Sequence, residues 1–147
     1  GREILRLLTA QNEHYLSLKQ VVTRQAGAIR AMDVAGLTSG AAEVRGVMRK
    51  VRDLEATIRP VRQSWNNLGR DRSPGEKRRV DALIDSIRNT ISEIQTVKDE
   101  NASLLEKSMQ EVRKQMSGLN SQSTAARAYG GPGPAPRQPA RFIDKSK

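Results

Sequence analysis

The chain has 147 residues, enough for one domain, and 26 Lys and Arg stand against 16 Asp and Glu, a formal net charge of +10. Aromatic residues make up 3% of the sequence, which disfavours a rounded enzyme core and favours an extended helical fold. The absence of cysteine excludes disulfides and thiol catalysis, and the single histidine, His14, excludes a histidine-based metal cluster. We therefore expect no metal, no other cofactor and no enzymatic activity. No apolar run of about 18 residues is present, so no membrane span is expected either.

Two heptad repeats predict the first two helices, over about 2–31 and 38–69. In the first repeat, apolar side chains recur every seven residues, and a second row lies between them: Leu8, Tyr15, Val22 and Ile29, with Ile4, Leu18 and Met32. In the second repeat both rows are apolar over four heptads: Leu37, Val44, Val51, Ile58 and Trp65, with Val47, Leu54, Val61 and Leu68. Turn and capping residues separate the two helices near 33–40. Pro60 predicts a kink, but not an end, in the second helix because the apolar rows continue through it.

A third, longer helix is predicted over about 74–119. Ser73 suits its N-cap, Pro74 the first helical position and Glu76 the third. Apolar residues then recur at helical spacing, from Val80 through Ile84, Ile87, Ile91 and Ile94 to Leu119. Residues 121–147 have no such periodicity and hold four of the six prolines, so we expect a basic, disordered or extended tail. The predicted fold is all-α: an elongated antiparallel three-helix bundle or coiled coil over residues 1–120, with a flexible tail.

The length of the third helix gives the first indication of function. Its predicted residues span roughly 65 Å, against about 45 Å for each of the other two helices. The part from about Leu104 onward should therefore lie beyond the bundle, and it carries an apolar stripe that we name by its six residues: Leu104, Leu105, Met109, Val112, Met116 and Leu119. An apolar face without an intramolecular partner is an interaction surface, and methionine suits a surface that accepts another helix. The alternatives are that the first two helices fold back, or that the chain dimerises along this stripe as a homo-oligomeric structural coiled coil. Asn101, just before the stripe, occupies an inner row where polar residues often fix helix register.

The basic surplus raises two further alternatives. A basic coiled coil could bind nucleic acid, but acidic residues alternate with basic ones through the predicted helices, so we expect no nucleic-acid partner. Binding of phosphate would weaken steeply with added salt, whereas capture of an apolar peptide would not. Association of the basic tail with a membrane surface would depend on the Phe142-Ile143 pair, which gives little anchoring by itself. The role of Arg141 to Lys147 is left open.

Three stretches of the sequence carry a family resemblance when taken together. The first runs from Glu100 through Ser108, followed by Val112, and contains a Glu-Asn pair, two leucines and a small residue. The others are the run from Met32 to Leu37 and the run Tyr129-Gly130-Gly131-Pro132-Gly133. In this order they resemble the C-terminal helix, the link between the first long helices and the tyrosine element before the tail in the FlgN family of flagellar export chaperones. The departures are the basic charge, Pro60 and the long proline-rich tail.

The resemblance implies a bacterial, cytoplasmic chaperone of the flagellar type III export system. Such a protein binds the terminal amphipathic helix of hook–filament junction (hook-associated) proteins and delivers them to the membrane export gate. The residues expected to bind the client protein are Asn101, Leu104, Leu105, Met109, Val112, Met116 and Leu119. The resemblance also implies that Tyr129 contacts the cytoplasmic domain of the export gate. Which junction protein is the client is not indicated.

Overall fold

The computed structural model describes the backbone of residues 1–129 and the side chains of residues 1–120. This part of the chain contains three α-helices and no strand. The helices are α1 (Arg2–Arg30), α2 (Val34–Asn67) and α3 (Pro74–Tyr129), and a 3-10 turn (Gly69–Asp71) precedes α3. The all-α fold class predicted from the sequence is confirmed. No helix in the described residues is both long enough and apolar enough to cross a membrane.

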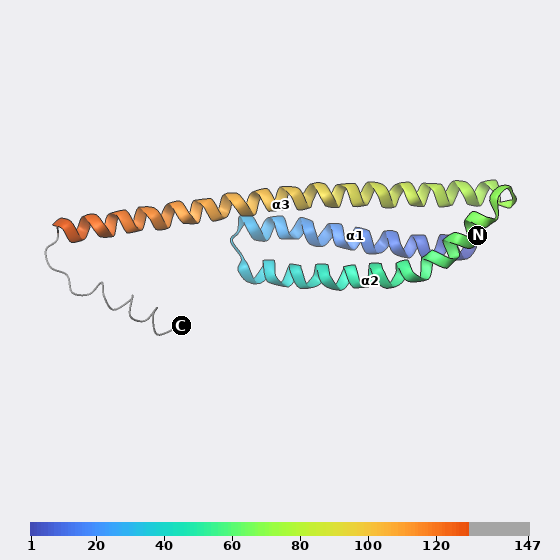
Figure 1. Ribbon diagram of the computed structural model, residues 1–147, viewed down its shortest axis with the longest axis horizontal. Helices are drawn as coiled ribbons and strands as arrows, with labels where there is room; N and C mark the ends of the chain where they lie inside the picture. Colours follow the sequence, from blue (N-terminus) through green and yellow to red (C-terminus); the bar gives the residue numbers. More distant parts are fainter. Residues whose placement is uncertain (130–147) are drawn as a thin grey trace. The chain divides into compact units, whose positions relative to one another are not determined.

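The chain divides into two compact units, of which the first is Gly1–Ser108 and the second begins at Met109. In the first unit α1 lies alongside both other helices (Figure 1). One core cluster joins Ile4 and Leu8 of α1 to Trp65 of α2 and Val80 of α3. A second core cluster is built on Leu18, Val22 and Ile94. Most residues of the predicted heptad rows are thus buried or half-buried in this unit, but Met32 and Leu68 are 63% and 44% exposed, and Leu7 and Val21 are buried although they lie outside the rows.

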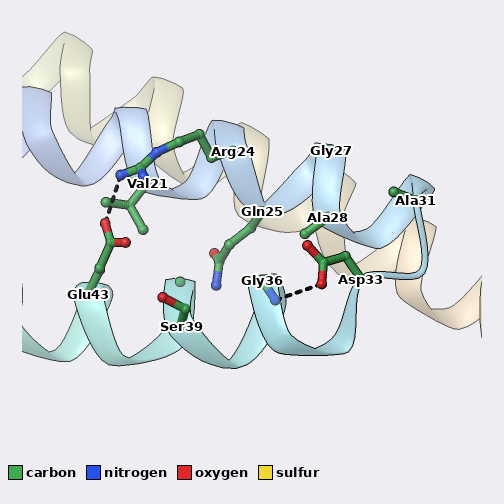
Figure 2. Close-up of a pocket in the computed structure, with 11 residues that line it drawn as sticks. Val21, Arg24, Gln25, Gly27, Ala28, Ala31, Asp33, Gly36, Ser39 and Glu43 are labelled. Atoms are coloured by element: carbon green, nitrogen blue, oxygen red, sulfur yellow. Dashed lines mark hydrogen bonds and ion pairs between the residues drawn. The ribbon is translucent and has the colours of Figure 1, made fainter.

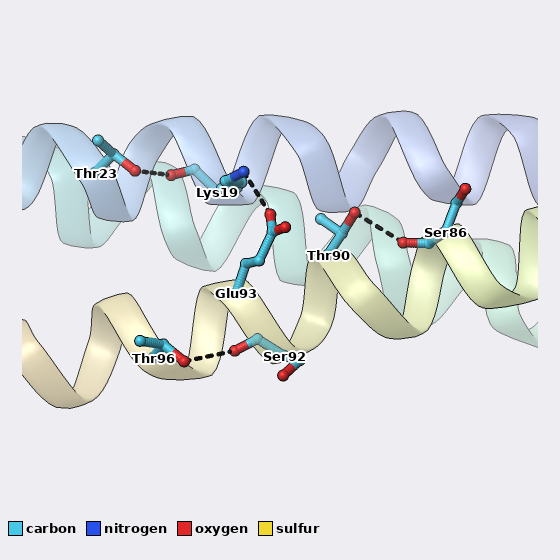
Figure 3. Close-up of polar contacts among 7 residues, drawn as sticks. All are labelled: Lys19, Thr23, Ser86, Thr90, Ser92, Glu93 and Thr96. Carbon is cyan, nitrogen blue, oxygen red and sulfur yellow. Dashed lines mark hydrogen bonds and ion pairs between the residues drawn. The ribbon is translucent and has the colours of Figure 1, made fainter.

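Exposed ion pairs join α1 to each of the other two helices, and a buried hydroxyl of α3 is satisfied within its own helix. Lys19 of α1 forms an ion pair with Glu93 of α3 (Figure 3), and Arg24 of α1 pairs with Glu43 of α2 at 2.7 Å (Figure 2). The buried Thr90 donates its hydroxyl to the Ser86 carbonyl one turn earlier in α3, at 2.9 Å, so this hydroxyl needs no partner from another helix (Figure 3).

The link between α1 and α2 is shorter than the sequence suggested, because α2 begins at Val34 rather than near residue 38. Asp33 caps α2 by accepting a hydrogen bond from the Gly36 N–H at 2.9 Å (Figure 2). Gly36 and Gly40, which suggested a turn, instead lie inside the helix. Gly40 is buried, and a Cβ there would come within 2.9 Å of the Gln25 Cγ atom. Glycine at this position thus lets α2 pack closely against α1.

The third helix ends at Tyr129 rather than near residue 119, so residues 121–129 are helical and not part of an extended tail. Gly118 does not stop the helix, because the residues after it include the good helix formers Ala and Arg. The Gly-Gly-Pro run that starts at Gly130 is the first strong sequence stop after Gly118. The rest of the predicted tail, 130–147, lies outside the described residues.

The α2 helix continues through Pro60, as the sequence predicted.

Candidate functional site

The candidate site is the apolar stripe on α3. From Leu105 its members follow one another at intervals of four, three, four and three residues, which places them on one face of the helix. No proline interrupts α3, and its only glycines, Gly75 and Gly118, lie inside the helix. Leu104 and Leu105 lie on the part of α3 in the first unit, and Met109, Val112, Met116 and Leu119 lie on the part in the second unit.

The side chains of the stripe are far more exposed than those of the core. Leu105 is 40% exposed, Met109 44%, Met116 60% and Leu119 64%, whereas the core side chains are at most 6% exposed. Leu104 and Val112 are half-buried. Large apolar side chains that lie singly on a surface are ordinary, but a regular row of them on one helix face marks an interaction surface.

Asn101 does not share this exposed face. Its side chain is 8% exposed, and its amide donates a hydrogen bond to the Val22 carbonyl of α1 at 2.8 Å. Its Oδ1 atom is buried and has no hydrogen-bond partner. Asn101 thus sets the alignment of α3 against α1, which is the role that polar residues on inner rows often have.

Tyr129 is the last residue of α3. Its side chain, and with it the predicted contact with the export gate, lies outside the described residues. Within the described residues no cluster of three or more His, Cys, Asp or Glu side chains could hold a metal ion. The chemistry that the stripe offers is burial of apolar surface.

One exposed apolar residue was not distinguished by the sequence. Ile91 belongs to the regular apolar row of the third helix, yet it is 41% exposed in the first unit. It lies two heptads before Leu105, which has almost the same exposure. The heptad position shared by Ile91 and Leu105 could have indicated this, because residues at one heptad position tend to have similar exposure.

A long helix with a regular exposed apolar face defines a class of proteins that bind other proteins through helix faces. The model of one protein family, described as FlgN protein, matches residues 2–137, nearly the whole chain. The chain belongs to the FlgN family, and it is therefore a member of a family of flagellar export chaperones. Neither the curated proteins nor the solved structures gave a match.

Proposed function

We propose that this chaperone binds the terminal amphipathic helix of a hook–filament junction protein on its apolar stripe, and that it escorts this client through the bacterial cytoplasm to the type III export gate. The exposed stripe is the observation that carries the proposal. In this mode of recognition an amphipathic helix lays its apolar face against an apolar helix surface. Covering the client's own assembly surface prevents its premature polymerisation.

The stripe is large enough for reversible binding. Full burial of one Leu or Met side chain contributes about 1.5–3 kcal/mol. Ordering the client segment and immobilising both partners offset part of that gain. A surface with a handful of such anchors therefore gives dissociation constants of roughly micromolar to nanomolar, which suits a client that must later be released.

The proposal is tested by calorimetry with peptides from the termini of junction proteins. We expect the double substitution Leu105→Asp and Met109→Asp to weaken binding about a hundredfold, because two anchors of at least about 1.5 kcal/mol each are lost. A matched control is Leu16→Asp with Met32→Asp, since these two side chains are also apolar and exposed (44% and 63%) but lie outside the stripe. Wild-type affinity in the stripe variant would show that the client binds elsewhere.

Two further measurements separate the alternatives. Self-association along the stripe would appear as a doubled mass in light scattering, which the stripe variant would return to that of a monomer. Binding of nucleic acid would weaken steeply as salt is added, whereas binding of the client peptide is expected to change little. For the second step of the proposed escort, we assign Tyr129 to contact with the cytoplasmic domain of the export gate, as the family resemblance implies.

A further inference from the structure

Two adjoining hollows lie between α2 and α3 in the first unit, with α1 as their floor. Their volumes are about 370 and 560 Å³, and both are lined by Tyr15 and Ile91. They therefore form one continuous surface, which we call the α2–α3 groove. Along α1 the groove extends from Leu8 to Gln25, roughly 26 Å, which is the length of a helix of about five turns.

The groove offers apolar surface along its whole length. Its accessible apolar surface comes from Ile91, which is 41% exposed at the middle of the groove, and from the half-buried Val44, Met48, Ile84 and Ile87. Leu8, Leu18 and Val22 of the bundle core lie beneath them and are at most 5% exposed. Tyr15 is half-buried there, and its burial, with a smaller effect of the Glu55 carboxylate, raises the pKa of the phenol above its usual value. Tyr15 therefore adds a half-buried aromatic ring to the lining of the groove.

One polar group on the floor lacks a partner. Gln11 is 3% exposed, and its amide donates a 3.4 Å hydrogen bond to the Val51 carbonyl. Its Oε1 atom is buried and accepts no hydrogen bond within the described residues. This atom is buried and therefore out of reach of a docked side chain, so recognition in the groove depends on its apolar and charged lining.

The charges that line the groove are strongly biased. Four basic side chains line it against one acidic side chain, Glu55: Arg45, Arg62, Arg88 and Lys98. Glu55 is paired with Arg62 at 3.3 Å. No ion pair among residues 1–120 involves Arg45, Arg88 or Lys98. Arg45 on α2 and Arg88 and Lys98 on α3 are thus available to pair with acidic side chains of a partner.

Charge also argues against occupants from this chain. Residues 130–147 carry four basic residues and only one acidic residue, so the groove would repel them. A second copy brings a net charge of +10, and its stripe region from 105 to 119 is itself slightly basic. Nucleic acid would match the charges but not the apolar floor.

We propose that the α2–α3 groove is a docking site for one amphipathic helix of a partner protein whose flanks are acidic. The partner helix completes a four-helix arrangement, with its apolar face on α1 and its carboxylates beside Arg88 and Lys98 on one wall and Arg45 on the other. Arg88 and Lys98 lie ten residues apart on α3, roughly 15 Å, so the acidic residues of the partner recur about three turns apart. This site is separate from the apolar stripe and does not depend on the client proposed for it.

The test uses the full chain and three synthetic 18-residue amphipathic helices that share one apolar face and differ only in their flanks: Glu, Gln or Lys. Fluorescence anisotropy should rank their affinities in that order. The double substitution Arg45→Glu and Lys98→Glu is expected to weaken binding of the Glu-flanked peptide by about tenfold or more, because two attractive charges become repulsive. Tyrosine absorbance adds a second readout, since a docked helix desolvates Tyr15 and moves its titration to higher pH.

The control variant is Arg49→Glu with Arg79→Glu, which changes the net charge equally on exposed side chains that do not line the groove. It should bind the Glu-flanked peptide nearly as well as the wild type. The preference for Glu over Lys flanks should persist in the stripe variant Leu105→Asp with Met109→Asp, in which the stripe no longer captures amphipathic peptides. Equal affinity for the Glu and Lys peptides would overturn the proposal, as would equal losses in the groove and control variants. The proposal would also be overturned if only the stripe variant lost affinity for the Glu-flanked peptide, or if the protein formed a dimer that only the groove variant dissociates.

Discussion

At the scale of single residues, Met32 occupies a backbone conformation that normally belongs to glycine. Its φ is +54°, in the left-handed region, directly after the last residues of α1. The Asp33 N–H donates to the Ala28 carbonyl at 2.9 Å and the Met32 N–H to the Ile29 carbonyl at 3.1 Å, the pattern of a Schellman C-cap. An L-residue with a side chain is destabilised by about 1–2 kcal/mol in this conformation.

We therefore expect Met32→Gly to raise the free energy of unfolding by about 1 kcal/mol, even though it removes a side chain and adds freedom to the unfolded chain. Met32 is 63% exposed, so little packing is lost. Urea denaturation followed by circular dichroism measures the effect. The control is Ala31→Gly one residue earlier, where φ is −83° and glycine brings no relief, so stability should fall. A loss of stability in both variants would contradict the explanation.

At the scale of the helices, two glycines in α2 have different surroundings. A Cβ added to Gly46 meets nothing within 4 Å, whereas one added to Gly40 lies 2.9 Å from the Gln25 Cγ atom (Figure 2 shows Gln25 lying over this part of α2). Alanine is favoured over glycine in a helix interior by about 1 kcal/mol. Gly46→Ala should therefore stabilise the protein by about that amount, while Gly40→Ala should give no gain or a loss.

Thermal melts of both variants provide the comparison. If the contact with Gln25 causes the difference, then Gln25→Ala should restore the missing stability to Gly40→Ala and have a smaller effect on Gly46→Ala. Equal gains in the two alanine variants would mean that α1 and α2 separate more easily here than the close packing implies.

Much of the helix pattern could be predicted from sequence, because burial follows the heptad rows. Val51, Ile58 and Trp65, seven residues apart, are all buried, and α3 begins at the predicted Pro74. The start of α2 was predicted too late because glycine favours turns and also close helix contacts, and only the packing of Gln25 on Gly40 decides between them. The end of α3 was predicted too early because the regular apolar row stops at Leu119, whereas residues with good helix propensity continue after it.

The candidate site was predictable to a similar degree. The shared helix face of the apolar stripe follows from its spacing, and its exposure was expected from the greater length of the third helix. The inward placement of Asn101 depends on its bond to Val22, 79 residues earlier in the chain, which no local pattern specifies. The α2–α3 groove was missed for the same reason, because its lining comes from three helices and its basic residues lie between the apolar rows rather than in a motif.

At the scale of the whole molecule, the buried apolar core lies within the first unit. Every apolar side chain in the described residues that is buried in the core lies between Ile4 and Ile94. The chain cut after Ser108 should therefore unfold with nearly the same urea midpoint as the intact chain, because the core clusters remain complete. It should also lose most of its affinity for the junction peptide, since four of the six stripe residues are removed.

A midpoint in the cut chain that falls by more than about 1 M urea would show that the core depends on residues after Ser108. Full retention of peptide binding would show that the client does not need the stripe. The urea midpoint and the peptide affinity are measured independently. Comparing the cut chain with the intact chain therefore shows separately whether residues after Ser108 are needed for folding and for peptide binding.

Trp65, the only tryptophan in the sequence, is 5% exposed beside Ile4, Leu8 and Val80, with the Arg72 guanidinium 5.7 Å from the centre of its ring. Val80 and Leu105 are 25 residues apart on α3, roughly 37 Å. The fluorescence of the Trp65 indole will therefore report unfolding of the core around Ile4, Leu8 and Val80. It will not change when a peptide binds at Leu105. Optical detection of a captured peptide needs a dye attached to the peptide or to the distal part of α3.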